Sequence, residues 1–544
     1  MNTRFQYISI QLETIRGLQN SREIRQAIQN LPNGLDGTYD RIFEAIEPRN
    51  RKQVISMLKW LCFSTRPLRL GELAEIFILD PEKDVPFDPS DRLFSPDAVL
   101  TYLPNLVMTI PEGRESWTSE IKFTHFSIQE YLLSQRITQR PTKDYHIKEA
   151  DAHLHIANSC LAYHLHFRRF EDVTKDTVYE FILRLYATNH WYWHLEKVAN
   201  EPLPVVLKRR VLQVLDRNSH EYLNLLRSGG LRQYVPPLFY CASLPSTWPI
   251  RFLIENGADI DEISGNSSSY DRFALQHAIV EREPENAKVL LYSGANVNKQ
   301  GGATGNALQA AVTFGTVEIA QLLLTKSAEV NAQGGKFGNA LQAAASNGPT
   351  ELVQLLLDKG AEINAQGGLY GNALQAAASS GNVEIAQILL AKGAEVNAQG
   401  GLHGTVLLAA AGRGDADIIR LVLDHGADIN EQGGKYGNAL QAAAKHGDIQ
   451  AVKLLLDRGA DINARGGVFG NAIQAAAANR RYGTTNLLHS RGAKLDPPGP
   501  EWEEMLSRLS TGDYLEIGIP MVQRLKKFQA DPTSFRSWCY RLED

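Results

Sequence analysis

Apolar residues between about residues 236 and 499 recur with a fixed period of 33 residues. The stretch GNALQAA, or a close variant of it such as GTVLLAA, begins at six glycines spaced 33 residues apart: Gly305, Gly338, Gly371, Gly404, Gly437 and Gly470. Each copy leads into a Leu/Val-rich stretch with helical spacing, such as GPTELVQLLLDKG, which a glycine ends. The pattern predicts about eight consecutive pairs of helices, of which the outer ones are degenerate.

Each unit of this pattern has recognisable start and stop signals. Asn339 precedes an apolar run and Gln342 follows three residues later, which is the spacing of a capping box at the start of a helix. The segment AEINAQGGKFG is extended and turns at Gly-Gly, which favours a hairpin. Such a unit cannot bury its apolar face alone, so the units must stack on one another.

The 33-residue unit resembles the ankyrin repeat. The usual T-P-L-H of that family is NALQ in this chain, whereas LVQLLLDKGAEIN matches the second half of the repeat closely. The resemblance implies that Asn and Gln replace the family's Thr and His as donors of hydrogen bonds between units. The expected fold is mainly α, with an ankyrin-repeat solenoid carrying β-hairpin fingers over residues 236–499 and capping helices over residues 500–544.

The residues before the array have a different pattern. LPNGLDGTYDRIFEAIE, RKQVISMLKWLCF and RPLRLGELAEIFIL each predict a helix, SPDAVLTYLPNLVMTIPEG predicts a helix followed by a strand, and EIKFTHFSIQEYLLSQRI predicts a strand that breaks at His125 into a helix. We therefore expect a winged-helix-like domain over residues 51–145, after a helical segment over residues 1–50, and a helical connector over residues 146–235. Residues 1–145 contain 18 Lys and Arg against 19 Asp and Glu, which argues against nucleic-acid binding.

The same region resembles the part that follows the ATPase core in fungal NACHT-type signalling NTPases, which belong to the NLR-like, or STAND, group and end in ankyrin repeats. The resemblance is carried by RFQYISIQLETIRG, KFTHFSIQEYLLS and YATNHWYWHLEKVA. It implies that residues 1–50 are the remnant that follows an NTPase core, and that His125 corresponds to a nucleotide-sensing histidine. The chain holds no G-x-x-x-x-G-K-[ST] motif. We therefore expect no bound cofactor, and either a natural short form or a missing upstream exon.

Motifs of enzymes and metal sites are absent from the sequence. There is no G-x-S-x-G, H-E-x-x-H or kinase-type H-R-D set, and a non-enzymatic protein is expected. The spacing of His153, His155, Cys160, His164 and His166 fits a packed helix better than a metal site. The net charge is −5, the four cysteines are widely separated, and no apolar run approaches the roughly 20 residues of a membrane span. These features predict a cytoplasmic or nuclear monomer.

Two sets of residues at variable positions are candidates for partner binding. The finger positions Thr304, Phe337, Tyr370, His403, Tyr436 and Phe469 form a row, in which rings occupy five of six places, beside Lys336 and Lys435. The ends of the first helices vary, and Arg413 and His446 are the candidates there. Aromatic rings flanked by cations are typical interface anchors. The alternative is that each ring packs on the next finger and only stiffens the array.

The sequence leaves three functions open. The leading one is a protein that binds a protein partner through the concave face of the array. The second is the sensor half of a NACHT-type NTPase in self/non-self recognition or cell death, and the third is a winged-helix nucleic-acid binder.

Overall fold

The computed structural model describes residues 34–112, 115–166, 181–200, 202–228, 234–264, 273–314 and 316–494. The chain divides into two compact units. We call Met1–Cys241 with Ser246–Asn256 the N-terminal unit, and Ala242–Pro245 with Gly257–Asp544 the array unit. The predicted capping helices of residues 500–544, and residues 1–33 of the predicted remnant, lie outside the described residues.

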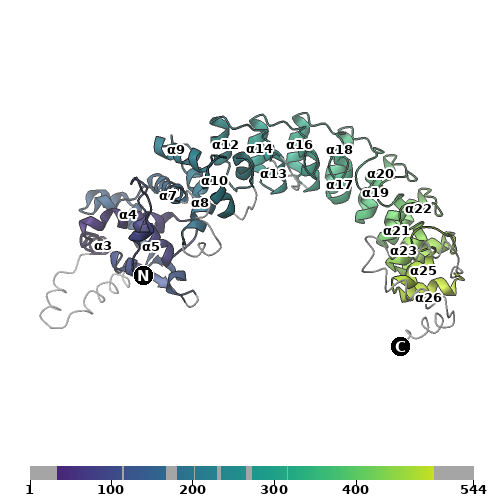
Figure 1. Cartoon of the computed structure of the whole chain (residues 1–544), viewed down its shortest axis with the longest axis horizontal. Coiled ribbons are helices and arrows are strands. Elements are labelled where there is room, and N and C mark those ends of the chain that lie inside the picture. The colour runs from purple at the N-terminus through teal and green to yellow at the C-terminus, as the bar shows by residue number, and fades with distance from the viewer. Residues whose placement is uncertain are drawn as a thin grey trace. The chain divides into compact units, whose positions relative to one another are not determined.

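The first part of the N-terminal unit combines helices with one small sheet (Figure 1). Its main elements are α3 (Leu35–Glu44), α4 (Arg51–Phe63), β1 (Leu68–Arg69), α5 (Leu70–Ile78), a 3₁₀ helix (Pro96–Tyr102), β2 (Val107–Ile110), β3 (Glu120–Phe123) and α6 (Phe126–Leu133). The strands are antiparallel and lie in the order β1-β3-β2. Leu68 pairs with Ile121 across the sheet, and both side chains are buried. The sheet therefore contributes to the same apolar core as the helices.

Most of the elements predicted here are present, with two corrections. The break at His125 is confirmed, since β3 ends at Phe123 and His125 is the N-cap of α6. The segment RPLRLGELAEIFIL does not form a single helix, because its residues 68 and 69 pair with β3 before α5 begins. The helix predicted in SPDAVLTYL is a 3₁₀ helix, and its N-cap Ser95 accepts a hydrogen bond from the N–H of Asp97.

Helices continue to the end of the N-terminal unit. They are α7 (Glu149–His164), α8 (Arg184–Glu196), α9 (Val205–Val214), α10 (His220–Ser228), α11 (Pro237–Ala242) and α12 (Trp248–Glu255). The pair α7 and α8 forms the centre of this region, where Tyr163 and Trp191 are fully buried. Burial of such large aromatic side chains supplies much of the apolar area that stabilises a domain of this size.

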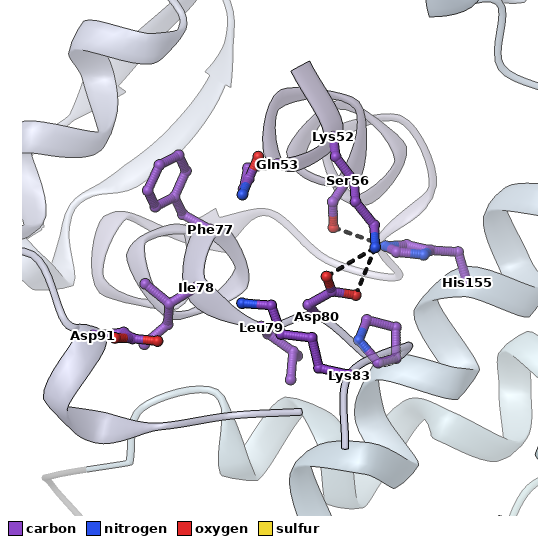
Figure 2. Close-up of a pocket in the computed structure, with 11 residues that line it drawn as sticks. Lys52, Gln53, Ser56, Phe77, Ile78, Leu79, Asp80, Lys83, Asp91 and His155 are labelled. Carbon is purple, nitrogen blue, oxygen red and sulfur yellow. Dashed lines mark hydrogen bonds and ion pairs between the residues drawn. The ribbon is translucent and has the colours of Figure 1, made fainter. Parts of the chain in front are cut away.

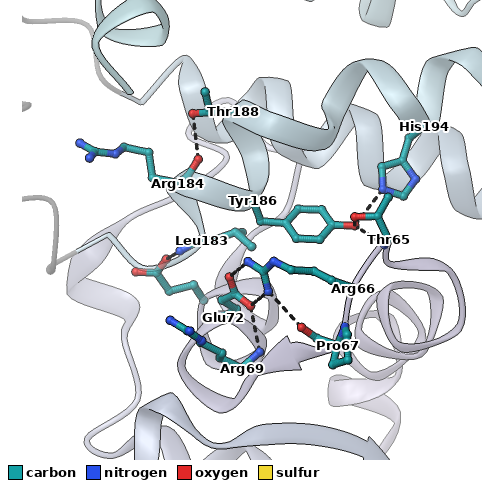
Figure 3. Close-up of polar contacts among 11 residues, drawn as sticks. Thr65, Arg66, Pro67, Arg69, Glu72, Leu183, Arg184, Tyr186, Thr188 and His194 are labelled. Atoms are coloured by element: carbon teal, nitrogen blue, oxygen red, sulfur yellow. Dashed lines mark hydrogen bonds and ion pairs between the residues drawn. The ribbon is translucent and has the colours of Figure 1, made fainter. Parts of the chain in front are cut away.

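Hydrogen bonds join α8 to the turn after α4 (Figure 3), and a further one continues from α8 to α7. The Tyr186 hydroxyl oxygen accepts the backbone N–H of Thr65 at 3.0 Å and lies 3.0 Å from His194 Nε2. His194 Nδ1 lies 2.8 Å from Nδ1 of His153, so one neutral ring donates to the other. The two histidines thus satisfy each other's polar atoms inside the core.

This pairing agrees with the interpretation of the histidine-rich segment as a packed helix. His153 contacts His194, whereas His155 Nε2 lies 2.7 Å from the Ser56 hydroxyl. Within the described ranges, no three metal-ligating side chains gather in one place. In the same ranges, no helix has the length and apolar character needed to cross a bilayer.

The array unit stacks helix pairs in sequence order, as the 33-residue period predicts (Figure 1). The first helices are α13 (Ala274–Val280), α15 (Ala307–Thr313), α17 (Ala340–Asn347), α19 (Ala373–Ser380), α21 (Val406–Arg413), α23 (Ala439–His446) and α25 (Ala472–Ala478). The second helices are α14 (Pro284–Tyr292), α16 (Val317–Thr325), α18 (Thr350–Asp358), α20 (Val383–Ala391), α22 (Ala416–Asp424), α24 (Ile449–Asp457) and α26 (Tyr482–Ser490). The predicted mainly α solenoid is confirmed.

Four of the first helices, α15, α17, α19 and α25, begin with the predicted capping box. Asn339 Oδ1 accepts the N–H of Gln342 at 2.9 Å, and Gln342 Oε1 accepts the N–H of Asn339 at 3.1 Å. The same reciprocal pair starts α15, α19 and α25. The boxes satisfy two backbone donors that would otherwise be unpaired at each helix start.

The same glutamines also join neighbouring units. Gln342 Nε2 donates to the carbonyl oxygens of Ala365 at 3.0 Å and Gly371 at 2.8 Å, both in the next unit. Equivalent bonds come from a set that we call the glutamine ladder: Gln276, Gln309, Gln342, Gln375 and Gln441. The prediction that Gln replaces the family's usual donors between units is therefore confirmed.

A second ladder runs through the segment that follows each second helix. Asn331 Oδ1 accepts the N–H of Glu362 at 2.8 Å, and its Nδ2 donates to the carbonyl oxygen of Gly360 at 3.1 Å. Three asparagines repeat these two bonds one period apart: Asn298, Asn364 and Asn397. Each unit is thus attached to the next at two separate places.

The glutamine ladder is interrupted at Leu408. This residue occupies the position of Gln375 and Gln441, is buried, and carries no donor. Thr405 caps the helix in place of Asn, and its hydroxyl accepts the N–H of Leu408 at 3.2 Å. The contact between this unit and the next therefore lacks the bonds of the glutamine ladder, while Asn430 still accepts the N–H of Asp461 in the next unit at 2.9 Å, as in the second ladder.

Restoring the ladder should stabilise the array. We expect Thr405→Asn/Leu408→Gln to raise the free energy of unfolding by about 1 kcal/mol, because the new amide would reach buried carbonyl oxygens of the next unit. Urea unfolding followed by far-UV circular dichroism measures the change. The control is Leu407→Gln, which places the same amide at a buried position where the neighbouring units have Leu374 and Leu440. That variant should lose about 3 kcal/mol, and an equal effect of both changes would contradict the ladder.

The predicted hairpins are short fingers that pack backbone against backbone. Each is closed by one β-bridge, such as that between Gly400 and Gly404, in which the Gly400 N–H donates to the Gly404 carbonyl oxygen at 2.8 Å. Gly401 has a φ of +62°, and the N–H of Leu402 donates to the Leu369 carbonyl of the preceding finger at 2.9 Å. A Cβ on Gly401 would overlap the carbonyl group of Tyr370. The Gly-Gly pair therefore permits both the turn and the close stacking.

Candidate functional site

The candidate site is the surface of the array made by the tips of the fingers and the ends of the first helices, which we call the finger face. Its position follows from the two ladders, which hold the fingers in register at 33-residue steps. Its variable side chains project from this fixed frame. All the partner-binding candidates of the sequence lie on it: Lys336, Phe337, Tyr370, His403, Arg413, Lys435, Tyr436, His446 and Phe469.

The rings of the finger tips do not form a uniformly exposed row. Phe337 is 7% and Phe469 4% exposed, whereas Tyr370, His403 and Tyr436 are half-buried. The prediction of exposed rings is thus corrected for the two phenylalanines. They are covered because rings of adjacent fingers stack: Phe337 on Tyr370, and Tyr436 on Phe469, both with centroids 6.2 Å apart. These contacts are the ones that the packing alternative requires, and they leave the tyrosines as the accessible members of each pair.

Lysines lie against these rings. Lys336 Nζ is 5.6 Å from the centroid of Phe337. Tyr436 has two such neighbours, with Lys435 Nζ at 5.0 Å and Lys445 Nζ at 4.9 Å from its centroid. A cation over an aromatic ring is attracted by the negative face of the ring. The arrangement concentrates positive charge beside Tyr436.

A hollow of about 500 Å³ opens on the finger face, lined by residues of three successive units. It is lined by Ser379, His403, Ala409, Gly412, Arg413 and His446. Burial and the neighbouring charge of Lys435 lower the pKa of His403 below its usual value, so this ring is neutral at pH 7. A neutral imidazole keeps one donor and one acceptor available.

Sequence reasoning found three of the six lining residues and missed the others. His403, Arg413 and His446 were candidates, Ser379 and Gly412 stand at the variable ends of first helices without having been chosen as candidates, and Ala409 is a repeated small residue. The available signal was that Gly412 lies in the same unit as the exceptional Leu408. A comparison of that unit with its neighbours would have indicated the hollow.

His125, the candidate nucleotide sensor, lies in the N-terminal unit. Its Nδ1 accepts the N–H of Ser127 at 3.1 Å, as an N-cap does. Its Nε2 is buried and has no hydrogen-bond partner within the described residues. The local role of the ring is therefore to start α6, and one of its nitrogens remains unused.

The N-terminal unit has a separate pocket of about 260 Å³ (Figure 2). Lys52 bonds there to the carboxylate of Asp80 at 2.8 Å and to that of Glu82 at 3.0 Å. Ser56 and His155 pair with each other on another side of it. Lys52, Asp80, Ser56 and His155 thus already have partners within the pocket wall, which Lys83 and Asp91 also line.

Comparisons with known proteins agree with the repeat architecture. Models described as ankyrin repeats match residues 308–400 and 374–466, and a further one matches residues 275–324. Residues 275–466 of the array unit therefore form ankyrin repeats. A curated relative, the azaphilone pigments biosynthesis cluster protein L of Monascus ruber, is 31% identical over 305 residues, which are 51% of this chain and 63% of that protein. The crystal structure of the human ASB11 ankyrin repeat domain matches with 26% identity and a TM-score of 0.36, covering 41% of this chain and 99% of that one.

Proposed function

We propose that this chain is a non-enzymatic interaction protein whose finger face binds another protein. The observation that carries the proposal is the pair of half-buried tyrosines, Tyr370 and Tyr436, on a rigid frame. The second of them lies beside the cations Lys435 and Lys445, and Arg413 lies on the same face. Tyrosine and arginine are enriched among residues that dominate binding energy at interfaces. Because the fingers are fixed by two ladders, little conformational entropy is lost when a partner binds.

The array supports this function better than it supports catalysis. Ankyrin arrays are scaffolds whose repeated surface presents residues to a partner, and the fold alone specifies no reaction. The name of the Monascus ruber relative places that protein in a biosynthesis cluster and states no reaction. Since the match spans 63% of that relative, we carry over no activity from it.

The proposal is tested by affinity capture with the full chain. We expect wild-type protein to retain a defined set of proteins from a cell lysate, and Tyr370→Ala/Tyr436→Ala to lose most of them. The matched control is Tyr292→Ala, which removes an exposed tyrosine from the second helix α14. Mass spectrometry of the retained proteins provides the measurement. Identical sets from the wild type and the double variant would contradict a role of the finger face.

A second candidate function concerns the N-terminal unit. We propose that residues 51–145 are a winged-helix-like module of the NACHT-associated kind, and that His125 is its nucleotide-sensing position. The strand order β1-β3-β2 and the unpartnered, buried Nε2 of His125 support this. Mapping the transcript tests it: an in-frame phosphate-binding motif upstream of the Met1 codon would favour a signalling NTPase, and its absence would count against one. DNA binding is the weaker alternative, and it would need salt-dependent affinity for duplex DNA.

A further inference from the structure

We propose that the hollow between His403, Arg413 and His446 is the subsite that receives an acidic side chain, Asp or Glu, of the partner protein. This inference rests on the proposed protein-binding function and adds the chemistry of the segment that is bound. It depends on three features of the hollow: its origin, its donors and its surrounding charge.

The hollow exists because one unit departs from its neighbours at two positions. Gly412 stands where the adjacent units have Ser379 and Lys445, and His403 stands where the adjacent fingers have Tyr370 and Tyr436. Each departure removes side-chain volume from the same place, between a finger and the end of a first helix. The opening therefore arises at a defined unit, from residues that differ from those of its neighbours.

The donors around the hollow have few partners of their own. The Arg413 side chain makes one long hydrogen bond within the described residues, to the Ser379 carbonyl oxygen at 3.4 Å. The Ser379 hydroxyl is buried and has no hydrogen-bond partner within the same residues. An unpaired buried hydroxyl is costly, and an incoming acceptor would remove that cost. The site thus offers a guanidinium fork and a hydroxyl to the same oxygen atoms.

Glycines hold two of the side chains around the hollow in place. Arg413 lies over Gly381, and His446 lies over Gly414, each so close that a Cβ on the glycine would overlap the side chain. Both glycines have left-handed backbone conformations, with φ of +78° and +80°. Each glycine therefore leaves the space that is occupied by a side chain of the next unit. A guanidinium held in this way loses less rotamer entropy when it binds a carboxylate.

The nearby carboxylates do not neutralise the site. Asp415 and Asp448 are the N-caps of the second helices next to it, and they accept the backbone N–H groups of Ile418 at 3.1 Å and Ala451 at 2.8 Å. Both carboxylates thus point at the N-terminus of a helix, where the helix dipole stabilises a negative charge. Lys435 and Lys445, held on Tyr436, add positive charge on the adjoining finger and helix. Charge complementarity therefore favours an acidic segment over a basic or neutral one.

Peptide selection on the full chain tests this subsite. Immobilised protein is used to select from a random 12-residue peptide library displayed on phage, at 50 and 300 mM salt. The pocket variant is Arg413→Gln/His446→Gln. The matched control is Arg420→Gln/His425→Gln, which changes the same residue types on and just after the exposed side of α22. Thermal unfolding by circular dichroism verifies that each variant keeps its fold.

We expect the wild type and the control to select peptides with Asp or Glu at a fixed position, more strongly at 50 mM salt. A selected peptide, labelled and measured by fluorescence anisotropy, should bind the pocket variant about tenfold more weakly. Replacing its acidic residue with the amide should weaken binding to the wild type by a similar factor, with little further loss in the pocket variant.

The two proposals fail in different ways. Peptides that bind without an acidic preference, or with equal affinity for the pocket variant, would overturn the subsite and leave the protein-binding function in place. Failure of every form to select a peptide, together with empty affinity capture, would overturn both.

Discussion

Lowering the pH from 7.5 to 5.0 should remove about 6 kcal/mol from the folding free energy of the N-terminal unit. The cause is three histidines, since burial lowers the pKa of His155 and His194 to about 3 and that of His164 to about 4. Their pKa in the unfolded chain is close to 6.5. Each contributes about 2 kcal/mol over this range, which compares with the 5–15 kcal/mol stability of typical domains.

The direction follows from proton uptake. Above pH 6.5 the imidazoles are neutral in both states, so their contribution does not change with pH. Between pH 6.5 and about 4 the unfolded chain binds protons that the folded core does not accept, because the charged rings would lose their hydration. Stability is therefore lost as the pH falls through this window. The buried Glu75 acts in the opposite direction, since burial raises its pKa. Burial also lowers the pKa of His153 and His190, which adds to the effect of the three histidines.

Tryptophan emission is the measurement for this unit. Five of the chain's seven tryptophans lie in it: Trp60, Trp117, Trp191, Trp193 and Trp248. Replacing the other two, Trp502 and Trp538, with Phe restricts the emission to this unit. Urea midpoints measured at several pH values should fall steeply below pH 6.5. His164→Leu is the diagnostic variant, because it removes a ring whose Nε2 is buried without a partner in the described residues. In this variant the slope of the unfolding free energy against pH should fall by the equivalent of up to one bound proton. An unchanged slope would contradict the role given to His164.

Gly401→Ala is the substitution expected to damage the array most. Its cost should be about 4 kcal/mol, because the new Cβ would overlap the Tyr370 carbonyl and force two fingers apart, in addition to the strain of a φ of +62°. The bond from the Leu402 N–H to the Leu369 carbonyl oxygen would be broken by the same movement. Urea unfolding by far-UV circular dichroism measures the loss.

Gly393→Ala separates stacking from strain. Gly393 also has a positive φ, +95°, but nothing lies within 4 Å of the position of a Cβ there. Its replacement should cost about 1 kcal/mol, the usual penalty of a left-handed residue with a side chain. Equal losses in the two variants would show that the fingers do not depend on close backbone packing.

The sequence was sufficient to predict the elements that depend on local patterns. The period, the helix pairs, the Asn339 cap with Gln342 and the His125 helix start all follow from spacing and from residue types. The strand at residues 68 and 69 was missed because it is only two residues long and forms through pairing with β3, about 50 residues later in the chain.

The candidate site was harder to predict for a related reason. Tyr370 and Phe337 occupy equivalent positions and differ by one hydroxyl group, but one is half-buried and the other is buried. Which ring of a stacked pair is covered depends on the next finger, and sequence spacing does not determine it. The hollow likewise needs Ser379, Gly412 and His446 together, and these residues belong to three different units.

The gap in the glutamine ladder at Leu408 has a mechanical consequence. An array whose units contact only their neighbours transmits tension through a series of contacts, and such a series separates first at its weakest contact. A pulling force along the array should therefore open the contact after the unit of Leu408 before the others. The array would then behave as two stiff segments joined by one contact that separates at a lower force. This contact lies next to the hollow that we assign to an acidic side chain.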